Sequence, residues 1–159
     1  MKNWQEIHND SKVVDWHNHA ALKRSLFKRN LGTTKKKFLS GLFERVTWPL
    51  SKSTFPQMEE GGMDIILSTN YIPEQEWEED ISLIKWLLAF SPELRKEIFD
   101  PTYFNATIHM MDSMEGEINK YNESRKEGSR EIKLSTGINQ LKANLENKNI
   151  INIVHSVEG

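Results

Sequence analysis

Three residues of this sequence have types and positions that could support chemistry: His17, His19 and Glu158. In an extended segment, residues two apart point to the same side, so the two imidazoles of His17-Asn18-His19 would project together. Imidazole is the commonest nitrogen ligand of zinc, and a carboxylate can bridge two metal ions through its two oxygens. The three residues are therefore candidate metal ligands. Asp15, two residues before His17, is a candidate to orient one of the histidines.

Each of these signals also has an alternative interpretation. A His-x-His triplet occurs by chance, and Glu158 could be an exposed carboxylate without a role. The remaining histidines are weaker candidates. His8 lies in a polar leading segment, His109 lies within a predicted helix, and His155 lies three residues before Glu158, on the opposite face of an extended strand.

Composition excludes several other chemistries. The chain has no cysteine, so a disulfide or a thiolate metal site is impossible. A nucleophile elbow, a P-loop and a dinucleotide-binding glycine motif are also absent from the sequence. The net charge of -2 gives no reason to expect nucleic acid or an anionic membrane as a partner. The polar start and the short apolar stretches predict a cytoplasmic protein.

The candidate residues must be positioned by strands and helices that the apolar pattern predicts. Strands are predicted near residues 13–17, 63–69 and 150–155. Helices are predicted near residues 76–90, 91–99, 103–124 and 136–147, the last capped by Thr136, and residues 20–56 form a long, partly helical excursion. Strands separated by helical crossovers indicate one α/β domain with a parallel sheet and helices outside it.

The predicted helix at residues 103–124 has a distinct apolar stripe. The stripe consists of Phe104, Ile108, Met111, Met114, Ile118 and Tyr121. Its spacing by three and four residues predicts the face that packs on the core. A methionine-rich groove for a partner is the alternative.

Three segments resemble the membrane (renal) dipeptidase family, zinc peptidases of the amidohydrolase superfamily. The family's opening strand, which ends in D-x-H-x-D, is similar to VVDWHNHA. Its second strand, with a glycine pair and an exit proline, is similar to MEEGGMDIILSTNYIPE. Its helix and following strand, which ends in Glu-Gly, are similar to LSTGINQLKANLENKNIINIVHSVEG. The order and spacing of the segments also match, so the resemblance covers nearly the whole chain.

The resemblance implies the N-terminal part, about three strands with their helices, of a TIM-type (β/α)8 barrel, with residues 1–159 as one incomplete domain. It further implies a site for two zinc ions and the hydrolysis of a dipeptide or similar small amide by a metal-activated water. His17 matches the histidine ligand of the first strand, and Glu158 matches the glutamate that bridges the metals. His19 stands where the dipeptidases have aspartate. The wider superfamily has His-x-His there, so a ligand role is retained.

A complete barrel needs about 250 residues, so we expect the chain to be part of a longer enzyme and inactive as a peptidase by itself. Besides a small peptide substrate, the expected partner is the remainder of the barrel or another copy of the chain. The alternatives are a non-catalytic interaction module, or another amidohydrolase activity such as a deaminase or a lactonase.

Overall fold

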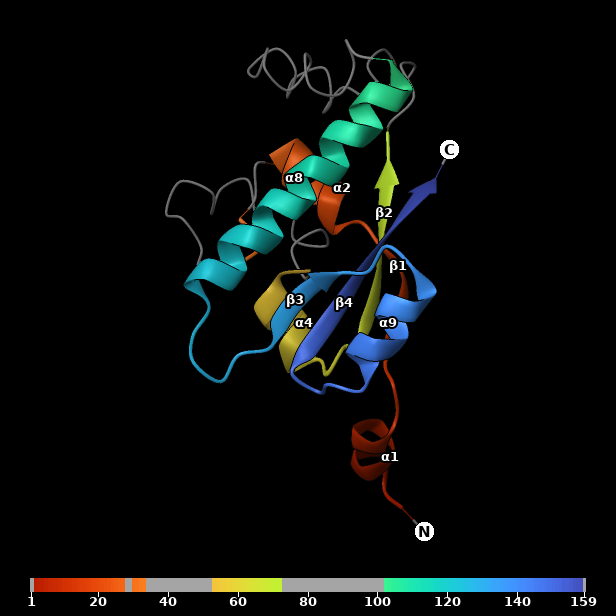
Figure 1. The fold of residues 1–159 in the computed structure, drawn as a ribbon, viewed down its shortest axis with the longest axis vertical. Coiled ribbons are helices and arrows are strands. Elements are labelled where there is room, and N and C mark those ends of the chain that lie inside the picture. The colour runs from red at the N-terminus through yellow and green to blue at the C-terminus, as the bar shows by residue number, and fades with distance from the viewer. Residues whose placement is uncertain (1, 28–29, 34–52, 73–101, 159) are drawn as a thin grey trace.

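A parallel β-sheet organises the structure, a computed structural model that describes residues 2–27, 30–33, 53–72 and 102–158 (Figure 1). The strands are β1 (Val14–Asn18), β2 (Ile65–Tyr71), β3 (Glu131–Leu134) and β4 (Ile150–Glu158). They are hydrogen-bonded in the order β1-β2-β4-β3, and each neighbouring pair is parallel. The predicted α/β class with a parallel sheet is therefore confirmed.

The three predicted strands correspond to β1, β2 and β4, and they lie side by side in chain order. β2 pairs with β4 along its whole length, from Ile65 opposite Asn152 to Tyr71 opposite Glu158. The sequence does not predict β3, because its four residues, EIKL, include only two apolar side chains. β3 is a short edge strand that pairs with β4 only over Ile150–Ile153. This four-stranded sheet does not by itself define a barrel, so the expected (β/α)8 barrel stays a prediction.

The helices of the described residues are α1 (Trp4–Asp10), α2 (Ala20–Phe27), α4 (Phe55–Glu60), α8 (Tyr103–Ser124) and α9 (Ile138–Leu145). The helices predicted near residues 76–90 and 91–99 lie outside the described residues. The sequence does not predict α1, because its residues are mostly polar, although the helix begins with a capping box. Asn3 Oδ1 accepts from the Glu6 N–H, and the Glu6 carboxylate accepts from the Asn3 N–H. None of the helices described has the length and apolar character needed to cross a membrane.

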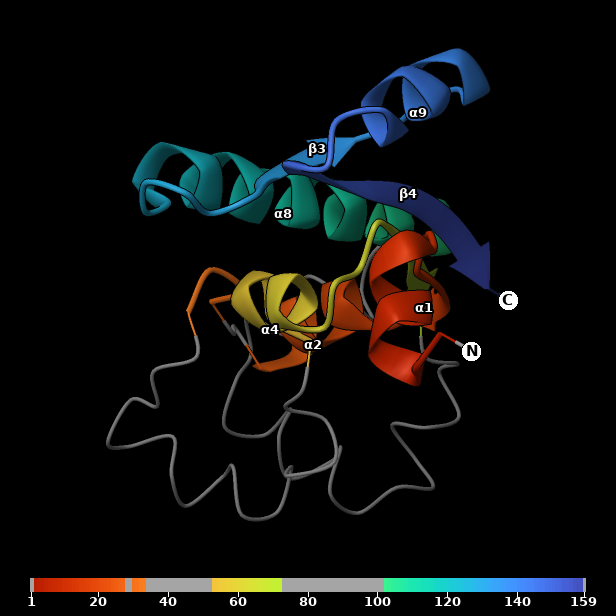
Figure 2. The ribbon, with the colours of Figure 1, turned by 90° about the horizontal axis from the view of Figure 1, so that it is seen from below.

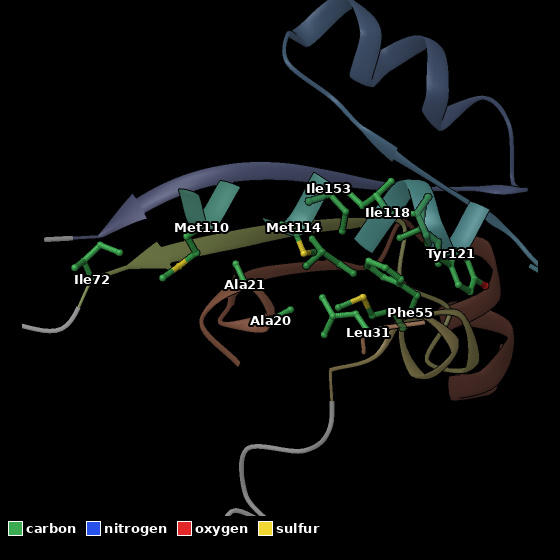
Figure 3. Close-up of a cluster of buried hydrophobic side chains, with 14 of the residues drawn as sticks. Ala20, Ala21, Leu31, Phe55, Ile72, Met110, Met114, Ile118, Tyr121 and Ile153 are labelled. Atoms are coloured by element: carbon green, nitrogen blue, oxygen red, sulfur yellow. The ribbon is translucent and has the colours of Figure 1, made fainter. Parts of the chain in front are cut away.

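The long helix α8 covers one face of the sheet and supplies much of the core. Figure 3 shows Met114 and Ile118 of α8 close to Ile153 of β4, and Met110 close to Ala21 of α2. The bounds predicted for this helix are confirmed, but the predicted stripe is wrong in its first half. Phe104 is 73% exposed and Ile108 is 39% exposed, whereas the buried side chains begin with Ala106 and Met110. Ala106 and Met110 lie two positions further along the helix than the predicted pair, because α8 packs against α2 as well as against the sheet, and this contact selects a different face of its first turns.

The short helix α9 lies on the other side of β4 (Figure 2). Asn144 of α9 donates to the side chain of Asn152, whereas Ile151 and Ile153 belong to the core beneath α8. Its first residue follows Gly137, so the prediction that Thr136 caps this helix is wrong. The Thr136 hydroxyl donates instead to Gln140 Oε1, at 3.2 Å.

Candidate metal centre

The structure brings His17, His19 and Glu158 together at the carboxyl end of the sheet. The Nε2 atoms of the two histidines lie 2.8 Å apart. Glu158 Oε2 lies 3.5 Å from His17 Nε2 and 3.8 Å from His19 Nε2. Within the described part of the chain, they form the one group of three side chains placed to share a metal ion. The predicted convergence of these residues is confirmed, and their role as metal ligands stays a prediction.

The sheet explains how residues from opposite ends of the chain meet. β1 and β4 flank β2 and run parallel to it, so their carboxyl ends lie at the same edge. Tyr71 ends β2 directly opposite Glu158, and its ring centroid lies 6.5 Å from that of His19 in an edge-to-face arrangement. The sequence analysis does not predict that Tyr71 lies beside the site. Its position at the end of a buried strand is the signal that could have identified it.

An irregularity in β1 aims the two imidazoles. Asp15 pairs with Ile66, and Asn18 pairs with Ser68, so β1 has one more residue than β2 in this interval. Such a β-bulge shifts the alternation of side chains by one position. Asp15 and Asn18 therefore meet, with Asn18 Nδ2 donating to Asp15 Oδ2 at 2.7 Å. His17 and His19 are left facing Glu158.

The bulge also changes the role of Asp15. We expect from the sequence that Asp15 shares a face with His17 and orients a histidine. In the structure, its carboxylate accepts from the backbone N–H of His17 at 3.1 Å and from the Asn18 amide. Asn18 Oδ1 in turn accepts from the N–H of Ala20, the first residue of α2. Asp15 thus orients His17 through its backbone N–H rather than through its ring, and the predicted shared face is wrong because of the bulge.

The surroundings of His19 favour a neutral ring that can donate its lone pair to a metal. Its side chain is 31% exposed, compared with 57% for His17 and 47% for Glu158. Partial burial lowers the pKa of His19 below its ordinary value of 6.5, and the charge of His17 lowers it further, while Glu158 acts in the opposite direction. Its Nδ1 is buried and has no well-aligned hydrogen-bonding partner within the described part of the chain. The backbone of Thr69 does act on this ring and raises its pKa.

Two of the three distances between the candidate ligand atoms are close to those of a zinc site. Atoms bound to tetrahedral zinc at about 2.0–2.2 Å lie about 3.3–3.6 Å from one another. The two carboxylate–imidazole distances, 3.5 and 3.8 Å, lie within or near that range. The 2.8 Å between the imidazoles would have to widen by about half an ångström. Two nitrogens and one carboxylate oxygen also form a donor set that zinc accepts.

The remaining histidines lie outside this group. His155 is on the opposite face of β4 from Glu158, as predicted, where it contacts Asn70 of β2 and Glu115 of α8. His109 is exposed on α8, and His8 lies on α1.

The fold and the site define an α/β protein with a His-His-Glu group at the carboxyl edge of a parallel sheet. Comparison of the chain with models of protein families, with curated proteins and with solved structures gave no match.

Proposed function

We propose that this chain provides a zinc site to an enzyme that hydrolyses dipeptides or similar small amides. The observation that carries the proposal is the convergence of His17, His19 and Glu158, with spacing suited to one ion, at the carboxyl edge of a parallel sheet. In α/β enzymes, this edge is where catalytic residues collect. The resemblance to the membrane dipeptidases gives the reaction class.

The three side chains would have separate tasks. His17 and His19 would supply neutral nitrogen ligands, and Glu158 would supply one negative oxygen and reduce the net charge of the site. Three protein ligands leave one position of a tetrahedral ion open for water or a substrate carbonyl. When bound there, zinc would polarise the carbonyl and make the water a better nucleophile. Both histidine contacts of Glu158 use Oε2, so Oε1 is the atom that would reach a second ion.

The arrangement of the strands supports the finer proposal of a barrel. β1, β2 and β4 follow one another across the sheet in chain order, as neighbouring strands of a (β/α)8 barrel do, and β3 departs from this order as a short strand at the far edge of β4. Beyond Ile153, β4 has no second neighbouring strand within the described part of the chain. We infer that a further strand pairs there and brings ligands for a second ion.

Metal titration tests the site directly. The purified chain, stripped of metal by a chelator, is titrated with Zn²⁺ by calorimetry and with Co²⁺ by visible absorption. We expect one ion per chain, and we expect His17→Ala and Glu158→Gln each to weaken binding by more than about 100-fold. Replacing a residue that only supports a ligand costs about 10–100-fold, and these two are the ligands themselves.

His109→Ala is the matched control, because His109 is an exposed histidine on α8 that does not belong to the His17, His19 and Glu158 group. It should bind zinc as the unmodified chain does. Zinc binding that survives both His17→Ala and Glu158→Gln would contradict the proposal. Hydrolysis is then assayed on the product of the complete reading frame with a panel of dipeptides, and His17→Ala should abolish it.

A further inference from the structure

The last part of β4 has little support apart from its pairing with β2. The edge strand β3 stops opposite Ile153, so Val154–Glu158 has a neighbouring strand on only one side within the described residues. Ile153 is also the last fully buried side chain of β4, and Val157 is 65% exposed. Glu158 therefore stands at the end of a segment that hydrophobic packing alone does not hold.

Asn70 of β2 holds this segment from one side. Its side chain is completely buried. Its Nδ2 donates to the carbonyl of Ser68 on its own strand at 3.0 Å and to the carbonyl of Ser156 on β4 at 2.9 Å. The second bond joins the strands two residues before Glu158. A buried side-chain amide with these two acceptors resists movement of β4, because any shift would leave a buried N–H unpaired.

His155 holds the same segment from the side of α8. Its Nδ1 lies 3.3 Å from Asn70 Nδ2, and its Nε2 lies 3.5 Å from Glu115 Oε1 on α8. Both hydrogens of the Asn70 amide go to the carbonyls of Ser68 and Ser156, so His155 Nδ1 only contacts this amide, while Nε2 faces the Glu115 carboxylate. The His155 ring therefore contacts both β2 and α8, and His155 lies three positions before Glu158. Sequence reading treats His155 only as a histidine on the wrong face for the metal.

We propose that Asn70 and His155 are positioning residues of the metal site, which fix the end of β4 so that Glu158 stays within reach of His17 and His19. Neither residue touches the three ligand atoms, because both lie on the opposite face of the strands. They act through the backbone of Ser156 and through the contact with α8. This inference rests on the proposed zinc site.

The test measures zinc affinity, corrected for the folded fraction from circular dichroism, in chains with Asn70→Ala or His155→Ala. We expect each to raise the Kd by about tenfold, the lower end of what loss of a supporting residue costs. His155→Gln keeps an N–H that can donate to Glu115 on α8, so its Kd should rise less than that of His155→Ala. Asn122→Ala is the matched control. It removes a comparable side-chain tie, between α8 and the backbone of Ile132, far from Glu158, and it should leave the Kd unchanged.

A double-mutant comparison separates positioning from general destabilisation. If Asn70 acts by placing Glu158, Asn70→Ala should have no further effect on zinc affinity in the Glu158→Gln background, which keeps both histidines. The inference is overturned if Asn70→Ala leaves the Kd unchanged, if its effect persists in that background, or if Asn122→Ala has an equal effect. Zinc binding that depends on neither His17 nor Glu158 would instead overturn the proposed function, and the positioning role with it.

Discussion

At the scale of single residues, the burial of His155 has a measurable consequence for stability. Its side chain is only 14% exposed. Burial lowers the pKa of this histidine below its ordinary value of 6.5, although Glu115 and Asp112 of α8 act in the opposite direction. As the pH falls below 6.5, the unfolded chain therefore takes up a proton at this position before the folded chain does. The free energy of unfolding must fall over that interval, and the loss ends below the folded pKa.

We predict that His155→Gln makes stability less sensitive to acid, because it removes this group from the titration. The measurement is urea unfolding followed by circular dichroism at several values between about pH 7.5 and about pH 5. His19 titrates in the same direction and is present in both chains, so it cancels in the comparison. An equally steep loss of stability in the variant would show that His155 is not responsible.

At the scale of elements, α8 shows which apolar residues carry the packing. Met114 is fully buried against the sheet, whereas Phe104 is 73% exposed. We predict that Met114→Ala lowers the free energy of unfolding by about 2–5 kcal/mol, because it removes buried contacts and leaves a cavity. Phe104→Ala, on the same helix, should change it by no more than about 0.5 kcal/mol. Denaturant unfolding of the two variants checks both values, and equal losses would mean that the described packing of α8 is wrong.

At the scale of the whole molecule, Arg130 joins elements that are far apart in the sequence. Its guanidinium donates to Asp64 Oδ1 at 3.0 Å and to the carbonyls of Met63 and Ile150, both at 2.6 Å. Its backbone N–H donates to Glu59 at the end of α4. The side chain therefore ties the amino ends of β2 and β4 together, at the edge of the sheet opposite the candidate metal centre.

We predict that Arg130→Met lowers the free energy of unfolding by about 3–5 kcal/mol, because it leaves the largely buried Asp64 carboxylate without its cation. Arg130→Lys should recover only part of this, since an ammonium cannot make the same planar set of contacts. Zinc affinity per folded chain should not change in either variant. Calorimetric titration of samples with a known folded fraction checks this, and a large change in affinity would mean that the two ends of the sheet are coupled.

Local patterns in the sequence determined the elements that have strong signals of their own. The apolar runs that became β1, β2 and β4 need only a few adjacent residues to be recognised. The bounds of α8 follow from a long apolar period. His17, His19 and Glu158 also follow from local patterns, because polar residues at the ends of apolar strands are placed at one edge of any parallel sheet.

Tertiary structure decided every feature that depends on contacts between elements distant in the sequence. The residues of β3 form a strand because they pair with β4. Packing against the core determines which face of α8 is buried, and the apolar pattern of that helix predicts a partly different face. The bulge that turns Asp15 away from the histidines comes from the pairing of β1 with β2. The contacts of Asn70, His155 and Arg130 join segments distant in the sequence, and no local spacing encodes such contacts. Hydrogen-bond geometry between elements is set only when the elements pack, so these residues could be recognised only in the folded chain.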